Sequence, residues 1–135
     1  MKKVTAAIIT DSNNKILIAQ RSKEDKLSLK WEFPGGKIKE GETPEECLIR
    51  EIREELCLDI EVGKFFEKSI YHYDSGSIEL LAYYAKVLKG TTKLLVHNDV
   101  RWVDITEITK YDFAPADIPI VESLVTLNYS DIQKF

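Results

Sequence analysis

The sequence predicts an α+β fold in which helices pack on the faces of a mixed β-sheet. Three observations support this fold class. Strand-like stretches, rich in β-branched residues, outnumber the helical stretches. One helix has a complete start signal, and a second helix follows only after two long strand-like stretches. The 135 residues, 44% of them hydrophobic, are enough to bury a core, so we expect one domain over residues 1–135.

The first strands are expected to form a hairpin. Val4–Thr10 and Ile16–Gln20 are rich in β-branched residues, and the turn-forming stretch Asp11–Asn14 separates them. A polar loop over residues 22–30 follows. A short strand over Trp31–Phe33 then stops at the sequence Pro-Gly-Gly.

The first helix has the clearest signal for its start. Thr43 is the expected N-cap, Pro44 occupies the first helical position, and Glu46 completes a capping box. The helix then carries an apolar stripe at helical spacing, made of Leu48, Ile49, Ile52 and Leu56. We expect Asp59 to end this element.

The rest of the chain is expected to hold more strands and a last helix. The expected strands are Ile60–Tyr73, Ser77–Leu88 and Val100–Val103. Asp104–Lys110 is a candidate for a short helix. The last helix is expected from Asp117 or Ile118 to Leu127. Pro119 lies near its start, where proline is tolerated.

Composition and charge argue against several classes of protein. The net charge of −4 leaves no basic field for a nucleic-acid backbone, although a divalent metal would allow a small polyanion to bind. No apolar stretch approaches the roughly 18 residues of a membrane helix, and none has the form of a signal peptide. Cys47 and Cys57 are expected to be reduced thiols, since about 15 Å of helix would separate them. We therefore expect a cytoplasmic protein that contacts neither a membrane nor a nucleic-acid polymer.

Three carboxylates crowd one side of the first helix. Glu51, Glu54 and Glu55 lie within an arc of roughly 100°. A divalent cation would relieve their mutual repulsion, and hard oxygen ligands suit Mg²⁺ or Mn²⁺. The alternative is a solvated, charged helix surface, since Arg50 and Arg53 are neighbours in sequence.

The spacing around these glutamates forms a recognisable motif. Gly36 is followed after five residues by Glu42, and after seven more by the run Arg50–Glu55. This pattern resembles the box of the Nudix family at every specified position but one, since Cys57 stands where the family has glycine. That glycine terminates the helix, so we expect Cys57 to affect local geometry and to remove no ligand.

The resemblance covers nearly the whole chain. The segments Trp31–Lys37 and Phe113–Pro119 are similar to those of MutT-type members of the family. The resemblance implies the Nudix α/β/α sandwich, with a mixed β-sheet between helices. It also implies hydrolysis of a nucleoside triphosphate to a monophosphate and pyrophosphate, with Mg²⁺ or Mn²⁺ as cofactor.

By the same resemblance, the box residues have defined roles. Glu51, Glu54 and Glu55 are expected to bind the metal. The Gly35 carbonyl is expected to complete the metal site. Either Glu51 or Glu54 is expected to act as general base, and Arg50 to orient a glutamate of the box through an ion pair.

Four further residues are expected to bind the substrate. Arg21 and Lys37 are candidates for phosphate contacts, with an exposed arginine at the end of a strand as the alternative for Arg21. Phe33 is a candidate for stacking on the base, although aromatic residues in strands more often belong to the core. Asp117 is the candidate reader of the base, and its alternative role is the N-cap of the last helix.

Asp117 also favours one class of substrate. An ionised carboxylate only accepts hydrogen bonds, and cytosine offers an N4 amino donor, so CTP-like substrates are favoured. A protonated Asp117 can also donate, which keeps 8-oxo-dGTP as an alternative. A non-catalytic domain that senses a nucleotide, and a hydrolase of another nucleoside diphosphate derivative, are the remaining alternatives. We expect a monomer or homodimer.

Some members of the family use an additional glutamate from a later loop. In this chain the matching stretch contains no glutamate, so Asn98 or Asp99 is a candidate substitute. We expect His97 to form hydrogen bonds within this loop rather than to act as a ligand.

Overall fold

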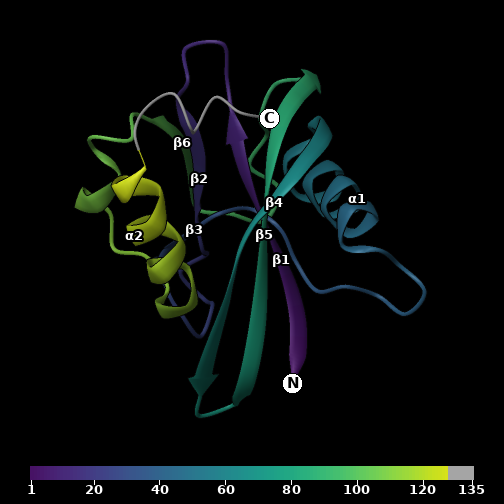
Figure 1. Cartoon of the computed structure of the whole chain (residues 1–135), viewed down its shortest axis with the longest axis vertical. Helices are drawn as coiled ribbons and strands as arrows, with labels where there is room; N and C mark the ends of the chain where they lie inside the picture. Colours follow the sequence, from purple (N-terminus) through teal and green to yellow (C-terminus); the bar gives the residue numbers. More distant parts are fainter. Residues whose placement is uncertain (128–135) are drawn as a thin grey trace.

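A computed structural model describes residues 1–127, and residues 128–135 of the predicted domain lie outside the described residues. The helices and strands follow one another along the chain as shown in Figure 1. The strands are β1 (Lys2–Thr10), β2 (Ile16–Gln20), β3 (Trp31–Glu32), β4 (Asp59–Tyr73), β5 (Gly76–Lys89) and β6 (Asp99–Val103). The α-helices are α1 (Pro44–Leu56) and α2 (Ile118–Thr126), and two 3-10 turns, η1 (Ile108–Lys110) and η2 (Pro115–Asp117), precede α2.

The described strands form one mixed sheet. Its order is β3-β2-β1-β5-β4, and β6 also pairs with β2. The β1–β5 pair is parallel, and the other pairs of strands are antiparallel. The predicted hairpin of the first two strands is confirmed, and the Asp11 carboxylate accepts hydrogen bonds from the backbone of Asn13 and Lys15 in its turn.

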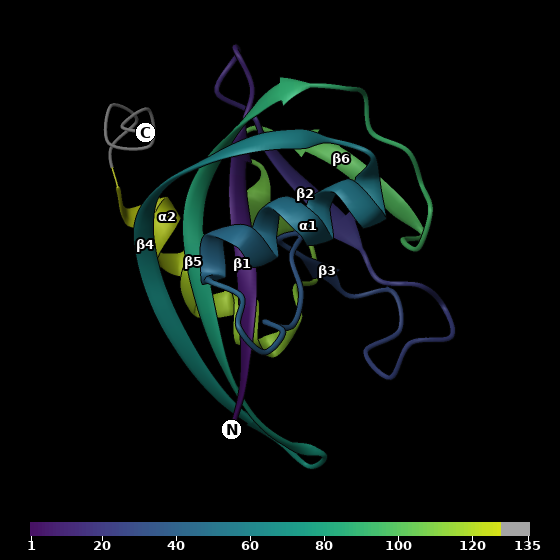
Figure 2. The same cartoon turned by 90° about the vertical axis from the view of Figure 1, so that its right-hand side faces the viewer.

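Each face of the sheet is covered by one helix, which confirms the predicted sandwich (Figures 1 and 2). The alternation of side chains along the strands divides the core in two. On β1, Ala7 and Ile9 face α1, whereas Ala6 and Ile8 face α2. Helix α1 contributes Leu48, Ile52 and Leu56 to its side, and α2 contributes Ile120, Val121 and Leu124 to the other.

The start of α1 is the predicted capping box. The Glu46 backbone donates to Thr43 Oγ1 at 3.1 Å, and the Thr43 backbone donates to Glu46 Oε1 at 2.9 Å. The expected end at Asp59 is wrong, because α1 ends at Leu56 and Asp59 already begins β4. Cys57 causes this early stop by adopting the left-handed conformation (φ 57°, ψ 31°), with its N–H bonded to the Arg53 carbonyl.

Two details near the end of the described chain differ from the prediction. The expected helix over Asp104–Lys110 shrinks to the short turn η1, because the Asp104 carboxylate binds the Thr106 backbone and favours a turn. Helix α2 starts at Ile118 with proline in its first turn, as predicted, but the Asp117 side chain makes no capping bond. That carboxylate is instead turned into the protein.

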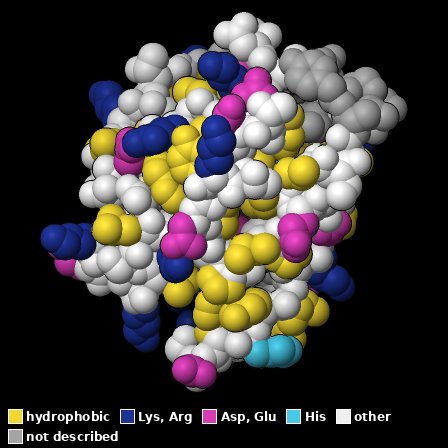
Figure 3. Space-filling model, turned by 90° about the vertical axis from the view of Figure 1, so that its left-hand side faces the viewer, with side chains coloured by type: hydrophobic (Ala, Val, Ile, Leu, Met, Phe, Trp, Pro, Cys, Tyr) yellow, Lys and Arg dark blue, Asp and Glu magenta, His cyan; other side chains and the backbone are white. Residues whose placement is uncertain are grey.

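The surface is mixed in character. On the face that Figure 3 presents, positive and negative side chains are scattered between hydrophobic ones, and neither sign dominates. Within residues 1–127, no helix is long and apolar enough to cross a membrane.

Candidate active site

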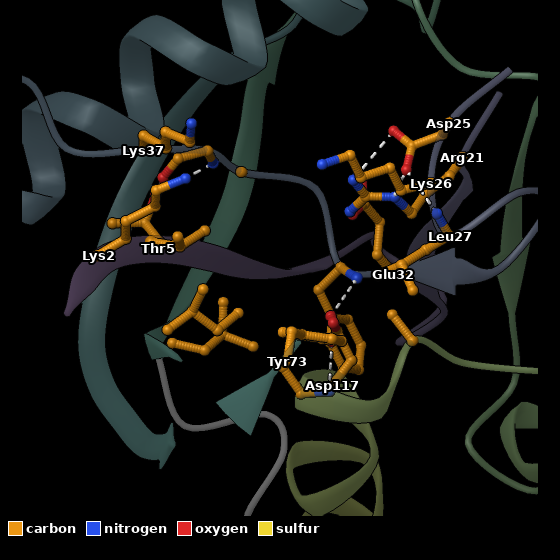
Figure 4. Close-up of a pocket in the computed structure, with 18 of the residues that line it drawn as sticks. Lys2, Thr5, Arg21, Asp25, Lys26, Leu27, Glu32, Lys37, Tyr73 and Asp117 are labelled. Atoms are coloured by element: carbon orange, nitrogen blue, oxygen red, sulfur yellow. Dashed lines mark hydrogen bonds and ion pairs between the residues drawn. The ribbon is translucent and has the colours of Figure 1, made fainter. Parts of the chain in front are cut away.

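A cleft of about 1050 Å³ brings together most of the residues that the sequence singled out. Figure 4 shows Lys2 and Lys37 on one side of it, Arg21, Asp25 and Lys26 on the other, and Tyr73 and Asp117 on a third. The predicted site residues that line it are Arg21, Phe33, Gly35, Lys37, Glu51, Glu55 and Asp117. Arg50 and Glu54 do not line this cleft and lie on the adjacent surface of α1.

The glycine pair passes between β1 and α1 at very close range. The Thr5 N–H donates to the Gly36 carbonyl at 2.8 Å, and the Ala7 N–H donates to the Pro34 carbonyl at 2.7 Å. Successive carbonyls of a paired segment alternate in direction, so the Gly35 carbonyl points away from β1. A Cβ on Gly35 would lie 2.0 Å from the Thr5 carbonyl oxygen, and one on Gly36 would lie 2.3 Å from the carboxyl carbon of Glu51. Gly35 therefore needs glycine because backbone leaves no room for a Cβ, whereas a Cβ on Gly36 would displace the Glu51 carboxylate.

Arg50 holds the box together from outside the cleft. Its guanidinium donates to both Glu42 carboxylate oxygens, at 2.6 and 2.9 Å, and to Glu51 Oε1 at 2.8 Å. It also reaches Glu54 Oε2 at 3.3 Å. The bond from Arg50 lowers the pKa of Glu42 to about 2. Arg50 thus links the loop before α1 to the glutamates of the helix.

The donor chemistry of the cleft fits a hard divalent cation. Glu55 is mostly buried, and its Oε1 is a buried atom without a hydrogen-bond partner among the described residues. Burial raises the pKa of Glu55 to about 7, an effect that the neighbouring His97 partly opposes. The Glu51 carboxylate lies directly against the glycine loop.

The predicted ligands are not gathered into a ready-made metal site, however. Within residues 1–127, no three His, Cys, Asp or Glu side chains are grouped in a way that would hold a metal ion. The reason is that Arg50 draws the Glu51 and Glu54 carboxylates towards itself. The Glu54 side chain is 57% exposed, whereas that of Glu51 is 16% exposed.

Arg21 is already paired with two carboxylates. Its guanidinium binds both oxygens of Asp25, at 2.9 and 3.0 Å, and Glu32 Oε1 at 2.7 Å. Sequence reasoning gave no role to Glu32, Lys2 or Lys26, all of which line the cleft. The sequence did contain a signal for Glu32. It is the polar residue between Trp31 and Phe33 in the expected strand, so its side chain is expected to lie on the opposite face from these two aromatic side chains.

The loop before β6 contributes a histidine to the cleft. His97 lines the cleft and its Nε2 lies 3.0 Å from Glu32 Oε2, so His97 forms a hydrogen bond as expected, but its partner lies on β3 and not within the loop. Asn98 and Asp99, the predicted candidates, are engaged elsewhere. Asn98 binds the Gln20 side chain, and Asp99 binds the backbone of Val100 and the side chain of Arg101.

Asp117 and Phe33 meet at the far end of the cleft. Asp117 is 6% exposed, and its Oδ2 accepts a hydrogen bond from the Phe33 N–H at 3.0 Å. Burial raises the pKa of Asp117 well above its usual range, and the nearby Glu32 charge acts in the same direction. The Phe33 ring is only 2% exposed and packs on Phe113, so it is a core side chain in this structure.

Comparisons with known proteins agree with the motif. Residues 1–124 match the model of the NUDIX domain. The chain is 35% identical over 127 residues to the CTP pyrophosphohydrolase of Escherichia coli (strain K12), covering 94% of this chain and 93% of that protein. It is 33% identical over 129 residues to the 8-oxo-dGTP diphosphatase of the same organism, covering 94% and 100%. The solution structure of the E. coli ORF135 protein matches with a TM-score of 0.82 at 35% identity, covering 96% of this chain and 92% of that one.

Proposed function

The chain belongs to the Nudix family, and from that premise we propose that it hydrolyses a nucleoside triphosphate to a nucleoside monophosphate and pyrophosphate. One observation carries the proposal. A single cleft brings Glu51 and Glu55 of the box together with Arg21, Lys37 and Asp117, which come from distant parts of the chain. Relatives about one-third identical over nearly their whole length are a CTP pyrophosphohydrolase and an 8-oxo-dGTP diphosphatase.

The phosphate chain is expected to lie between the two cationic sides of the cleft. Lys37 borders it on one side and Arg21 on the other (Figure 4). Both side chains supply positive charge to phosphate oxygens, and Arg21 offers a planar donor fork. Because Arg21 is held by Asp25 and Glu32, its position is fixed before substrate arrives.

The carboxylates of the box, Glu51, Glu54 and Glu55, and the Gly35 carbonyl would hold Mg²⁺ or Mn²⁺. The bound cation would neutralise phosphate oxygens and activate the attacking water. Glu51 is better placed than Glu54 to accept the proton of that water, because Glu51 lines the cleft and the Glu54 side chain is largely exposed. Arg50 is proposed to act as a positioning residue, since its bond to Glu51 Oε1 fixes that carboxylate.

Asp117 is proposed to read the base, with cytosine nucleotides favoured. Oδ2 accepts a hydrogen bond from the Phe33 N–H and retains a second lone pair, and burial raises the pKa of this carboxyl. An ionised carboxylate accepts a hydrogen bond from cytosine N4, and this pairing supports cytosine nucleotides. A protonated carboxyl would also donate to the O6 acceptor of guanine, and the raised pKa of Asp117 supports 8-oxo-dGTP as the second candidate.

A panel of nucleoside triphosphates tests the function. With Mg²⁺, we expect a monophosphate and pyrophosphate, and the highest kcat/KM for a cytosine nucleotide. Release of orthophosphate, or no turnover of any triphosphate, would contradict the proposal. Asp117→Asn should shift the preference from cytosine towards oxidised guanine, and equal relative rates before and after the substitution would reject Asp117 as the reader of the base.

The cellular location and the binding partner of the chain are proposed from its free thiols and its net charge. Cys47 and Cys57 are free thiols, as predicted, which supports the cytoplasmic location that the sequence suggests. The partner is proposed to be a small nucleotide rather than a nucleic-acid polymer, because the chain is acidic overall.

A further inference from the structure

His97 presents a buried nitrogen that the described part of the chain leaves without a partner. Its side chain is 4% exposed, and Nδ1 is buried with no hydrogen-bond partner among the described residues. A buried polar atom left without a hydrogen bond destabilises the fold. Such atoms in native proteins call for an explanation, and a bound ion or ligand is one of the few available.

The other side of the ring fixes which nitrogen carries the hydrogen. Glu32 accepts from Arg21 Nη1 through Oε1 and lies 3.0 Å from His97 Nε2 through Oε2. A carboxylate paired with arginine acts only as an acceptor, so Nε2 carries the hydrogen. In the neutral ring, Nδ1 then presents a lone pair. A carboxylate that orients a histidine in this way is the usual arrangement behind a histidine ligand of a metal.

A second unpartnered donor atom lies in the same cleft. Glu55 Oε1 is buried and has no hydrogen-bond partner among the described residues, and both Glu55 and His97 line the cleft. The two residues that follow His97 are bound elsewhere, since Asn98 donates to the Gln20 side chain and Asp99 accepts from the Val100 backbone. An imidazole nitrogen and a carboxylate oxygen are both common ligands of divalent cations.

We propose that His97 binds, through Nδ1, the divalent cation that the proposed function requires, together with Glu55 and with Glu32 orienting the ring. This inference rests on the proposed function and adds a nitrogen ligand to a set that the sequence predicted to consist of oxygens. A nitrogen ligand favours first-row transition cations over Mg²⁺. Tight binding of Mn²⁺ relative to Mg²⁺ is therefore expected.

Electron spin echo spectroscopy of the full chain with Mn²⁺, in the absence of nucleotide, tests the proposal. The chain has two histidines, so His72, which is exposed on β4 and contacts Ser77, provides the matched control. Wild type and His72→Asn should both show the ¹⁴N modulation of a coordinated imidazole, and His97→Asn should lose it. The dissociation constant of the His97→Asn variant for Mn²⁺ should also rise by about 10-fold or more. Glu32→Gln should weaken Mn²⁺ binding by about 10-fold and keep the modulation.

The outcomes separate the inference from the proposed function. Bound Mn²⁺ without imidazole modulation in wild type, or modulation that survives in His97→Asn, overturns the role of His97 and leaves the metal dependence intact. Absence of any Mn²⁺ binding to the free chain overturns the role of His97, and turnover of the triphosphate panel then decides the proposed function. If His97→Asn does not fold, the spectra of wild type and His72→Asn decide, because His97 is then the only imidazole available.

Discussion

Replacing the two adjacent glycines of the cleft by alanine, one at a time, should have different effects: Gly36→Ala should lower activity, and Gly35→Ala should lower stability. A Cβ on Gly36 would lie 2.3 Å from the carboxyl carbon of Glu51, and ordinary contact begins near 3.4 Å. The Glu51 carboxyl must therefore move by about 1 Å, which a flexible side chain can do. A misplacement of about 1 Å in a catalytic group costs roughly 100-fold in rate. Gly36→Ala should thus lose about two orders of magnitude in kcat/KM while remaining folded.

Gly35→Ala meets backbone instead of a side chain. Its Cβ would lie 2.0 Å from the Thr5 carbonyl oxygen, so the segment must separate from β1. Two hydrogen bonds, at 2.7 and 2.8 Å, join the segment to Thr5 and Ala7. Losing both leaves buried groups unpaired at about 1–3 kcal/mol each, so the free energy of unfolding should fall by about 2–6 kcal/mol.

Pyrophosphate release and urea unfolding measure the two effects on the same variants. Gly41→Ala is the control, because Gly41 has φ +80° with nothing within 4 Å of an added Cβ. It should lose about 1 kcal/mol of stability and keep its activity. The reasoning is refuted if Gly36→Ala retains the wild-type kcat/KM, or if it loses as much stability as Gly35→Ala.

Three further predictions concern α1 and its caps. Cys57→Gly should raise the free energy of unfolding by about 1 kcal/mol, since Cys57 is exposed and holds the left-handed conformation that glycine adopts without strain. Cys57→Ala, the control, should not raise it. Equal urea midpoints for the two variants would contradict the explanation. Glu54→Gln should lower kcat by roughly 10²-fold or more, because Glu54 is proposed to help hold the metal ion, and it should change unfolding little, because the side chain is 57% exposed; unchanged activity would remove Glu54 from the site. Because the pKa of Glu42 falls from 4.5 to about 2 on folding, its pairing with Arg50 stabilises the fold above pH 4.5 and is lost as the pH falls towards 2. In Glu42→Gln, the free energy of unfolding should therefore fall less steeply as the pH is lowered from 4.5 towards 2. A pH profile unchanged from wild type would count against this role of the Glu42–Arg50 pair.

Local signals in the sequence predicted the elements well. The capping box at Thr43 and the hairpin turn at Asp11 depend on residues within a few positions of one another, so their outcome can be read from the chain. The Nudix box was similarly readable, because its glutamates share one helix whose geometry fixes their relative positions. Even the departure at Cys57 was located correctly, although the early end of α1 that it causes was not.

The roles predicted for Asp117 and Arg21 changed because of the partners that each side chain finds in the fold. The Asp117 side chain has a local choice, the N-cap of α2, and a distant one, the Phe33 backbone N–H, and the distant partner wins. Arg21 lies where the sequence placed it, but Glu32 and Asp25 decide that it is paired before any substrate binds. Neither the Phe33 N–H nor Asp25 is marked by periodicity, and the alternation that marks Glu32 does not show that it pairs with Arg21.

The sequence by itself determined the fold class, the family and the helix that carries the glutamates, because these follow from spacing along one element. The tertiary structure alone decided which of those carboxylates face the cleft. Glu54 lies with Arg50 on the exposed side of α1, whereas packing against the sheet buries Glu55, which lines the cleft together with His97. The direction and burial of a side chain depend on what folds against it, so the gathering of Glu32, His97 and Asp117 around one cleft is a property of the packed molecule.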